Sequence, residues 1–226
     1  MILAILQAEM GSNRLPGQAL MPIVRQPMIV RQIERMARAR RIDKIVVAAS
    51  DRPEDDAIEA AVRREGVAVF RGSPDNVQQR LIGALEAHPA EHVVRLTADC
   101  PLADPNLIDA TITLCLSKDA DYASNTPEGH AHPKGTDVEV ITAAALRGAP
   151  LLDLRNQEGR WKRAWLPCYP DQGAVRWIVD RPDDYAFVAA VYDALYPKDR
   201  AFTSDDIRAF VKSRPDLADY GGDPRA

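Results

Sequence analysis

Short runs of β-type residues alternate with segments of helical period along the first half of this chain, and this alternation constrains the fold more than any other feature. Amphipathic helices are predicted between the runs, because apolar residues recur at intervals of three and four, as at Ile29, Ile33 and Met36. Repeated β-α units require a parallel sheet with right-handed crossovers. Four buried strands are predicted, at 2–7, 44–50, 67–71 and 92–97.

The second half of the chain departs from this rhythm after residue 117. Gly, Pro, His and charged residues crowd 125–136, strands are predicted at 137–141 and 175–179, and helices return after Pro182. The expected architecture is α/β, with three layers around a mostly parallel sheet and one domain over 1–215. The polar, Gly-containing segment 216–226 is expected to be a loose tail.

Composition narrows the class of protein. The net charge of -4, from 29 Lys+Arg and 33 Asp+Glu, provides no broad basic surface for a nucleic acid backbone. The apolar opening Met1–Leu6 is too short for a secretory signal, and no window reaches the roughly 18 apolar residues that cross a bilayer. The three cysteines contain no C-x-x-C pair and fit a reducing compartment. We therefore expect no nucleic acid partner, no membrane segment and a cytoplasmic location.

The loop after the first predicted strand, 8–18, carries a candidate phosphate site. Gly11 and Ser12 offer backbone N–H groups without bulky side chains, and Arg14 offers a planar cation. A plain connecting loop would also contain such residues, so this short pattern by itself is a weak signal.

Two carboxylates follow predicted strands directly. Asp99 comes at the end of 92–97 and before Pro101, while Asp180 comes at the end of 175–179 and before Pro182. Either could simply begin a turn or cap a helix. Together at strand ends they are also what a Mg²⁺ ion bound to a nucleotide needs, because such an ion takes one or two protein carboxylates.

An ordered set of motifs resembles a known family. The chain resembles the acylneuraminate and deoxy-octulosonate cytidylyltransferases, in the branch of spore coat polysaccharide biosynthesis protein F, over roughly 1–195. The ordered set is far more specific than any one of its motifs. The motifs are Q-A-E-M-G-S-N-R-L-P-G at 7–17, R-G-S-P-D-N-V at 71–77, R-L-T-A-D-C-P-L at 95–102, S-N-T at 124–126, D-V-E-V at 137–140 and W-I-V-D-R-P-D-D at 177–184.

The resemblance implies a glycosyltransferase-A-like, nucleotide-diphospho-sugar transferase fold. It implies transfer of CMP from CTP to a small acidic sugar with release of pyrophosphate, for surface polysaccharide or glycoconjugate synthesis, and a homodimer. It assigns Asp99 and Asp180 to Mg²⁺ and, with Arg14, to catalysis, and it directs Asn125 and Asp137 toward the acceptor. The nucleotide-binding residues that it implies are Gln7, Ala8, Gly11, Ser12, Arg14, Arg71 and Ser73.

The first loop departs from the pattern of related sequences. Glu9 stands where they typically have Arg, Gln18 where they have Lys, and Lys134 where an Asp commonly precedes the G-x-D-V-E-V segment. A carboxylate about 5 Å from a phosphate oxygen is repelled by about 3 kcal/mol at an effective dielectric of about 20. Three interpretations remain open: an active transferase with an altered substrate, a non-catalytic sugar- or nucleotide-binding or partner subunit, and a glycosyltransferase that uses a nucleotide-sugar donor.

Overall fold

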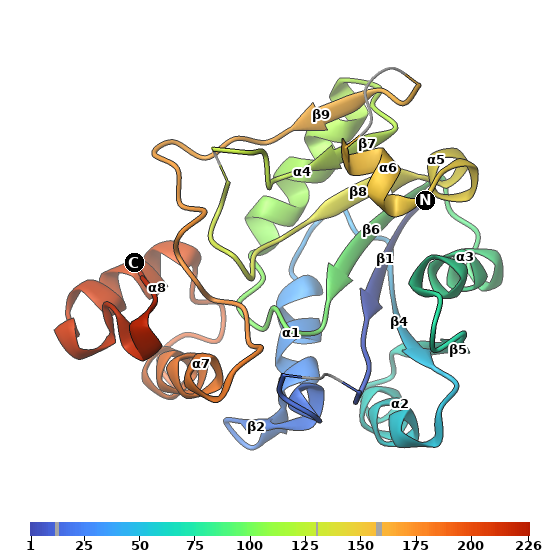
Figure 1. The fold of residues 1–226 in the computed structure, drawn as a ribbon. Helices are drawn as coiled ribbons and strands as arrows, with labels where there is room; N and C mark the ends of the chain where they lie inside the picture. Colours follow the sequence, from blue (N-terminus) through green and yellow to red (C-terminus); the bar gives the residue numbers. More distant parts are fainter. Residues whose placement is uncertain (12–13, 130, 157–159) are drawn as a thin grey trace.

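The computed structural model describes residues 1–11, 14–129, 131–156 and 160–226, which build a seven-stranded sheet flanked by helices (Figure 1). The strand order is β5-β4-β1-β6-β8-β7-β9, and a separate two-stranded hairpin joins β2 to β3. The strands are β1 (Ile2–Gln7), β2 (Pro22–Ile23), β3 (Gln26–Pro27), β4 (Lys44–Ser50), β5 (Ala68–Gly72), β6 (His92–Thr97), β7 (Tyr122–Ser124), β8 (Glu139–Thr142) and β9 (Arg163–Trp165).

The order of the strands reverses beside β1. From β1 the chain adds β4 and then β5 on one side, and it returns to place β6 on the other side, with all of these pairs parallel. In the sheet register, Gln7 lies level with Ala48 of β4 and with Thr97 of β6. The loops after β1 and β6 therefore leave the same edge together, and this switch point is where open α/β sheets bind ligands. Only β8, which pairs antiparallel with β6 and β7, runs against the other described strands of the sheet.

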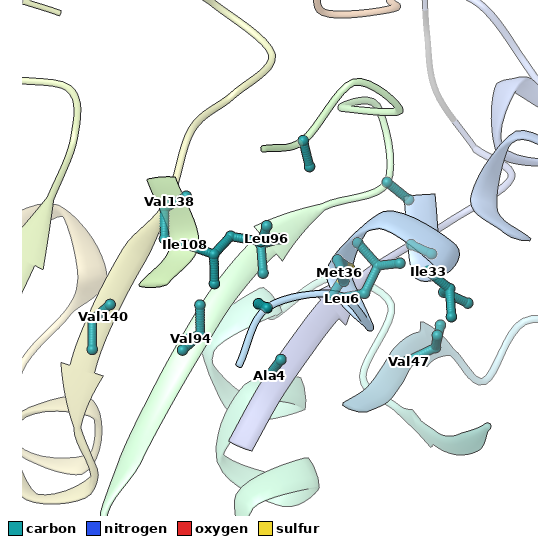
Figure 2. Close-up of a cluster of buried hydrophobic side chains, with 14 of the residues drawn as sticks. Ala4, Leu6, Ile33, Met36, Val47, Val94, Leu96, Ile108, Val138 and Val140 are labelled. Carbon is teal, nitrogen blue, oxygen red and sulfur yellow. The ribbon is translucent and has the colours of Figure 1, made fainter. Parts of the chain in front are cut away.

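Helices cover both faces of the sheet, as the sequence predicts. Alternate residues of β1 point to opposite faces because side chains alternate along a strand. Ala4 and Leu6 belong to one apolar cluster with side chains of α1, α2 and α4, and Figure 2 shows Leu6 beside Met36 and Ile33 of α1. Leu3 and Ile5 belong to a second cluster with side chains of α3, α5 and α6. The helices are α1 (Met28–Met36), α2 (Asp56–Arg64), α3 (Val77–Ala87), α4 (Pro105–Ser117), α5 (Ala143–Gly148), α6 (Leu151–Asn156), α7 (Pro182–Leu195) and α8 (Ser204–Lys212).

Local sequence signals explain where several helices begin. The side chain of Asp104 accepts a hydrogen bond from the backbone N–H of Asn106, and Pro105 occupies the first turn of α4. Thr203 and Asp206 form a reciprocal capping box at the start of α8. The predictions of strands at 2–7, 44–50 and 92–97 are confirmed, and those at 67–71 and 137–141 lie at 68–72 and 139–142.

The strand predicted at 175–179 is wrong. This segment is extended but lies outside the sheet, and its one β-bridge joins Arg176 to Lys134. The alternation of Val175, Trp177 and Val179 has another cause, because these side chains bury against α7 and α8 in a separate apolar cluster. An extended segment that packs one face on helices has the same two-residue period as a strand.

The prediction of a loose tail at 216–226 is also wrong. Arg225 is fully buried, and its carbonyl accepts a hydrogen bond from the indole Nε1 of Trp177 at 2.8 Å. Leu217 packs in the apolar cluster of α7 and α8, and the end of the chain lies beside these helices (Figure 1). The polar composition of this segment suggests exposure to solvent, but polar groups such as those of Arg225 form hydrogen bonds inside the fold.

Candidate active site

A cavity of about 430 Å³ lies at the switch point, between the loop after β1 and the end of β6. It contains Asp99 and Asp180 together with Arg14, so the structure brings together the three residues that the sequence predicts to be catalytic. The lining residues are Gln7, Ala8, Glu9, Gly11, Arg14, Gln18, Ala19, Thr97, Ala98, Asp99, Ile178 and Asp180.

Asp99 is held by the turn that ends β6. Its Oδ1 accepts a hydrogen bond from the Thr97 hydroxyl at 2.5 Å and another from the Cys100 thiol at 3.2 Å. The carbonyl of Asp99 accepts from the backbone N–H of Val179 at 2.8 Å. This contact seats the extended segment that ends in Asp180 on the end of β6, and so places the two carboxylates in one cavity.

Asp180 is nearly enclosed by arginines. Its Oδ2 accepts from the guanidinium of Arg14, and its Oδ1 accepts from Arg176, which comes four residues earlier. The side chain of Arg14 is 72% exposed and that of Asp180 is 11% exposed. Arg14 therefore has solvent space in which to turn toward an anion, whereas Asp180 is fixed.

The two carboxylates fit a divalent cation that also binds phosphates. Among the described residues, no group of three or more His, Cys, Asp or Glu side chains could hold a metal by itself. A hard divalent cation takes one or two carboxylates and completes its shell with water and substrate oxygens, so Asp99 and Asp180 are the residues that could hold one here. Arg14 and Arg176, and at 3.8 Å also Arg181, would compete with such a cation for Asp180.

Glu9, a departure from the family pattern, pairs with a buried arginine. Its Oε2 lies 3.4 Å from the Nη2 of Arg80, whose side chain is 0% exposed, while that of Glu9 is 45% exposed. Arg80 also donates through Nη1 to the carbonyl of Ser73 at 2.9 Å. The carboxylate in the first loop is thus partly balanced by a cation from α3, a pairing that the local sequence does not predict.

A second cavity of about 590 Å³ adjoins the first and shares Arg14, Thr97, Ile178 and Asp180 with it. Asp137 lies in this second cavity, where burial and then the charge of Asp99 raise the pKa of Asp137 to about 6. The other lining residues are Arg95, Leu96, Thr126, Ala131, His132, Lys134, Glu139, Arg155, Gly173 and Arg176.

Glu139 organises the floor of the second cavity. It accepts from the hydroxyl of Tyr122 at 2.7 Å and from Arg155 at 2.8 Å, and it also pairs with Arg95. Burial acts to raise the pKa of Glu139, but Arg95 and Arg155 outweigh it and hold that pKa below its usual value. No motif in the sequence predicts this cluster, although Arg95 falls two residues before Thr97 and so on the same face of β6.

A third cavity of about 320 Å³ extends from Glu9 and Gly11 to the ends of β4 and β5. Asp55 fixes its wall, because it accepts from the backbone N–H of Met10 at 2.7 Å and from the Ser50 hydroxyl at 2.6 Å. The lining residues are Glu9, Met10, Gly11, Ser50, Arg52, Glu54, Asp55, Pro74 and Asp75.

Three predicted site residues lie elsewhere. Arg71 pairs with Glu59 at 2.6 Å and with Asp56 at 2.9 Å, outside the linings of these three cavities. Ser73 caps the turn before α3 by accepting from the backbone N–H of Asn76. Asn125 is fully buried.

The side chain of Asn125 has a structural role. It donates to the carbonyl of Thr136 at 2.7 Å and accepts from the backbone N–H of Val138 at 2.8 Å. These bonds join the end of β7 to the segment that carries Asp137. Ser12, also predicted to bind nucleotide, lies outside the described residues.

Within the described part of the chain, no helix has the length and apolarity that crossing a bilayer requires. A family model described as cytidylyltransferase matches residues 3–146. Among curated proteins, the chain is 37% identical over 134 residues to the spore coat polysaccharide biosynthesis protein SpsF of Bacillus subtilis, which covers 57% of this chain and 56% of that protein. It is 33% identical over 172 residues to a 3-deoxy-manno-octulosonate cytidylyltransferase of Bradyrhizobium, which covers 74% of this chain and 67% of that enzyme.

The first curated relatives are matched over about half of their own length, from 44% to 56%. A solved cytidylyltransferase structure from Leptospira borgpetersenii superposes with a TM-score of 0.87 at 26% identity, covering 96% of this chain and 95% of that one. The fold is therefore that of the nucleotide-sugar cytidylyltransferases, as the sequence resemblance implies. With the family model spanning β1 to α5 and the site at the switch point of the sheet, this chain belongs to the cytidylyltransferase family.

Proposed function

We propose that this chain transfers CMP from CTP to a small acidic sugar and releases pyrophosphate, in the synthesis of a surface polysaccharide or glycoconjugate. One observation carries the proposal: Asp99 and Asp180 line the same cavity as Arg14 and the glycine-containing first loop. Paired carboxylates beside a cation and a glycine-containing loop suit a triphosphate with its metal ion. Membership of the cytidylyltransferase family supports the choice of CTP.

The nucleotide would lie across the first and third cavities, which share Glu9 and Gly11. We place the triphosphate in the first cavity, against Arg14 and Gly11, and the base and ribose in the third. Arg14 would leave Asp180 for a phosphate oxygen, because guanidinium groups bind phosphate through paired hydrogen bonds. Mg²⁺, held by Asp99 and Asp180, would neutralise phosphate charge when bound.

The acceptor would occupy the second cavity, and its charge supports an acidic acceptor. Five cationic side chains line that cavity against three carboxylates. The cations are Arg14, Arg95, Lys134, Arg155 and Arg176, and the carboxylates are Asp137, Glu139 and Asp180. An acceptor with a carboxylate would offset this excess positive charge.

The proposed reaction is an in-line displacement at the α-phosphate. An acceptor oxygen forms the new bond to phosphorus, the bond to pyrophosphate breaks, and the hydroxyl proton passes to solvent. The protein contributes chiefly alignment and charge neutralisation, with no covalent intermediate. Asp137, in the second cavity, would contact the acceptor.

We further propose that the chain acts as one domain, with Mg²⁺ as its metal, as a homodimer in the cytoplasm. The exposed apolar side chains of Leu152 and Tyr169 would suit a contact between two copies. Cys100, Cys115 and Cys168 are free thiols, which accords with a reducing compartment. Sedimentation equilibrium of the purified chain tests the homodimer, which a monomer mass at micromolar concentration would rule out.

Calorimetric titration with CTP, with and without Mg²⁺, tests the function. We expect Mg²⁺ to tighten CTP binding, and Asp99→Ala to abolish that gain. Asp205→Ala, which removes an exposed carboxylate on α8, is the matched control and should bind as the parent does. Release of pyrophosphate with CTP and 3-deoxy-manno-octulosonate then tests the transfer step.

Two other results would redirect the proposal. A folded protein that fails to bind CTP under either condition would favour the non-catalytic partner subunit, for which Glu9 in the phosphate cavity is the motivating observation. Binding of a nucleotide sugar in place of CTP would favour a glycosyltransferase.

A further inference from the structure

The carboxylate of Asp184, in the first turn of α7, forms the centre of a buried ion network beside Asp180. Its side chain is 0% exposed and accepts from Arg176 Nε at 2.9 Å and Arg176 Nη2 at 2.8 Å. It also accepts from Arg225 Nη2 at 3.0 Å and from the backbone N–H groups of Asp180 and Arg181 at 3.2 and 3.0 Å. The Asp184 carboxylate thus binds both ends of the segment 176–181 that precedes α7.

Arg176 connects this network to the candidate metal site. Its Nη2 donates both to Asp184 Oδ2 and to Asp180 Oδ1, so one guanidinium orients the two carboxylates relative to each other. Arg176 is in turn bound at its backbone, where its N–H donates to the carbonyl of Pro224 at 2.9 Å and its carbonyl accepts from Arg225 Nη1 at 2.7 Å. Residues at the end of the chain thus hold the residue that orients Asp180.

Arg225 has no exposed surface, and two of its guanidinium nitrogens reach this network, Nη2 at Asp184 and Nη1 at the carbonyl of Arg176. Its Nε donates to the carbonyl of Tyr220 at 2.9 Å, and its guanidinium lies 4.9 Å from the centre of the Phe187 ring. Burying a guanidinium and a carboxylate costs several kcal/mol of desolvation, which apolar packing would avoid. Ion pairs of fixed geometry, unlike apolar packing, set the direction of a side chain.

We infer that Arg225 is a positioning residue for Asp180: through Asp184 and Arg176 it holds the Asp180 carboxylate in the orientation that binds the metal–nucleotide complex. The inference rests on the proposed function. Outer partners of metal-binding side chains typically contribute about 10- to 100-fold to metal affinity, because they fix the orientation of the ligand. The segment 216–226, although remote in sequence from the phosphate loop, is then part of the site.

The test compares Arg225→Ala and Arg225→Lys with the parent chain. Lysine keeps the charge but cannot donate in the fork geometry that reaches Asp184, Tyr220 and Arg176 together. Arg214→Ala is the matched control, since it removes an exposed ion pair with Asp216 from the same end of the chain. The measurements are the Kd for CTP with and without Mg²⁺, the Tm, and hydrogen–deuterium exchange of 176–184.

We expect Arg225→Ala to weaken CTP binding in Mg²⁺ by about 10-fold or more, with CTP binding in the absence of metal unchanged. Exchange at the N–H groups of Asp180 and Arg181 should accelerate. Arg225→Lys should fall between the parent and Arg225→Ala, and Arg214→Ala should match the parent. If Arg225→Ala does not fold, the same comparison is made with Arg225→Lys.

Equal weakening of CTP binding with and without Mg²⁺ would overturn the inference, since general destabilisation acts on both. An unchanged affinity in Mg²⁺ would overturn it as well. If the parent binds no CTP, the proposed function fails. Hydrogen–deuterium exchange of 176–184 then tests separately whether Arg225 holds this segment in place. Faster exchange in Arg225→Ala than in Arg214→Ala then supports the part of the inference in which Arg225 holds the segment that carries Asp180, and equal exchange refutes that part.

Discussion

The pair formed by Glu9 and Arg80 leads to a quantitative prediction about nucleotide affinity. Glu9 stands at a position where the sequence resemblance leads us to expect a cation, and it lines the cavity proposed for the triphosphate. The structure adds that its carboxylate lies 3.4 Å from the buried guanidinium of Arg80. The phosphates of a bound nucleotide would therefore lie near both the Glu9 carboxylate and the Arg80 guanidinium. Removing the charge of Glu9 should strengthen nucleotide binding, and removing the charge of Arg80 should weaken it.

The magnitudes follow from Coulomb's law at an effective dielectric of about 20. Removing the charge of Glu9, about 5 Å from a phosphate oxygen, should tighten binding by at most about 3 kcal/mol, or about 100-fold. Removing the charge of Arg80, about 8 Å away, should weaken binding by about 2 kcal/mol, or about 30-fold. The double substitution should thus tighten binding by only about 1 kcal/mol, since the pair is nearly neutral as a whole.

The assay is calorimetric titration of CTP in Mg²⁺ with Glu9→Gln, Arg80→Gln and the double variant. Glu91→Gln is the control and should bind as the parent does, because the Glu91 carboxylate is exposed and pairs only with the amino group of Met1 among the ion pairs of the described residues. Because Glu9 is partly exposed, Glu9→Gln should lower the free energy of unfolding by only about 1 kcal/mol. A double variant that gains as much affinity as Glu9→Gln alone would refute the idea that Arg80 offsets the carboxylate.

Three further results are expected. Gln18→Lys should tighten CTP binding about 10-fold in low salt, because it would place a cation in the phosphate cavity. The Oε1 of Gln18 is buried there without a hydrogen-bond partner among the described residues, so the substitution breaks no such bond of this oxygen. A gain below about twofold by calorimetry would contradict this prediction. Asp137→Asn should raise the free energy of unfolding in urea by up to about 3 kcal/mol above pH 6, because the pKa of Asp137 is raised from 3.8 to about 6 in the folded protein and its charged form destabilises the fold. The gain should vanish as the pH falls to 4. A gain that does not depend on pH would refute the assignment of the effect to this charge. Gly135→Ala should lower the free energy of unfolding by more than about 3 kcal/mol, because φ is +98° and the added Cβ would lie 2.3 Å from the backbone N of Ile178. Gly129→Ala, where φ is +73° and no described atom lies within 4 Å of the added Cβ, should lower it by about 1 kcal/mol, and equal losses in urea would contradict the clash.

Sequence patterns predicted the elements that depend on neighbours in the chain. The strands at 2–7, 44–50 and 92–97 were predicted correctly because a strand buried on both faces is an uninterrupted apolar run. The same logic failed at 175–179, where alternating apolar residues pack on helices without joining the sheet. Periodicity reports which side chains are buried, and it does not identify what buries them.

Side-chain roles were harder to predict than elements. Arg71 was expected near the nucleotide, but it pairs with Glu59 and Asp56 of α2, because an arginine takes the nearest carboxylates that the fold offers. Asn125 was expected to face the acceptor, but its side-chain amide forms hydrogen bonds with the backbone of Thr136 and Val138 instead. Neither partner set follows from local sequence.

By itself the sequence determined the alternation of strands and helices and the presence of carboxylates after two extended segments, since both are properties of short stretches of chain. Only the tertiary structure decided that Asp180 meets Arg14, 166 positions earlier, and that Glu9 meets Arg80. It also decided that the end of the chain packs through Arg225 onto the same segment. Such contacts depend on the order of strands in the sheet and on which charged side chains become buried and need a partner. No local sequence pattern encodes either property.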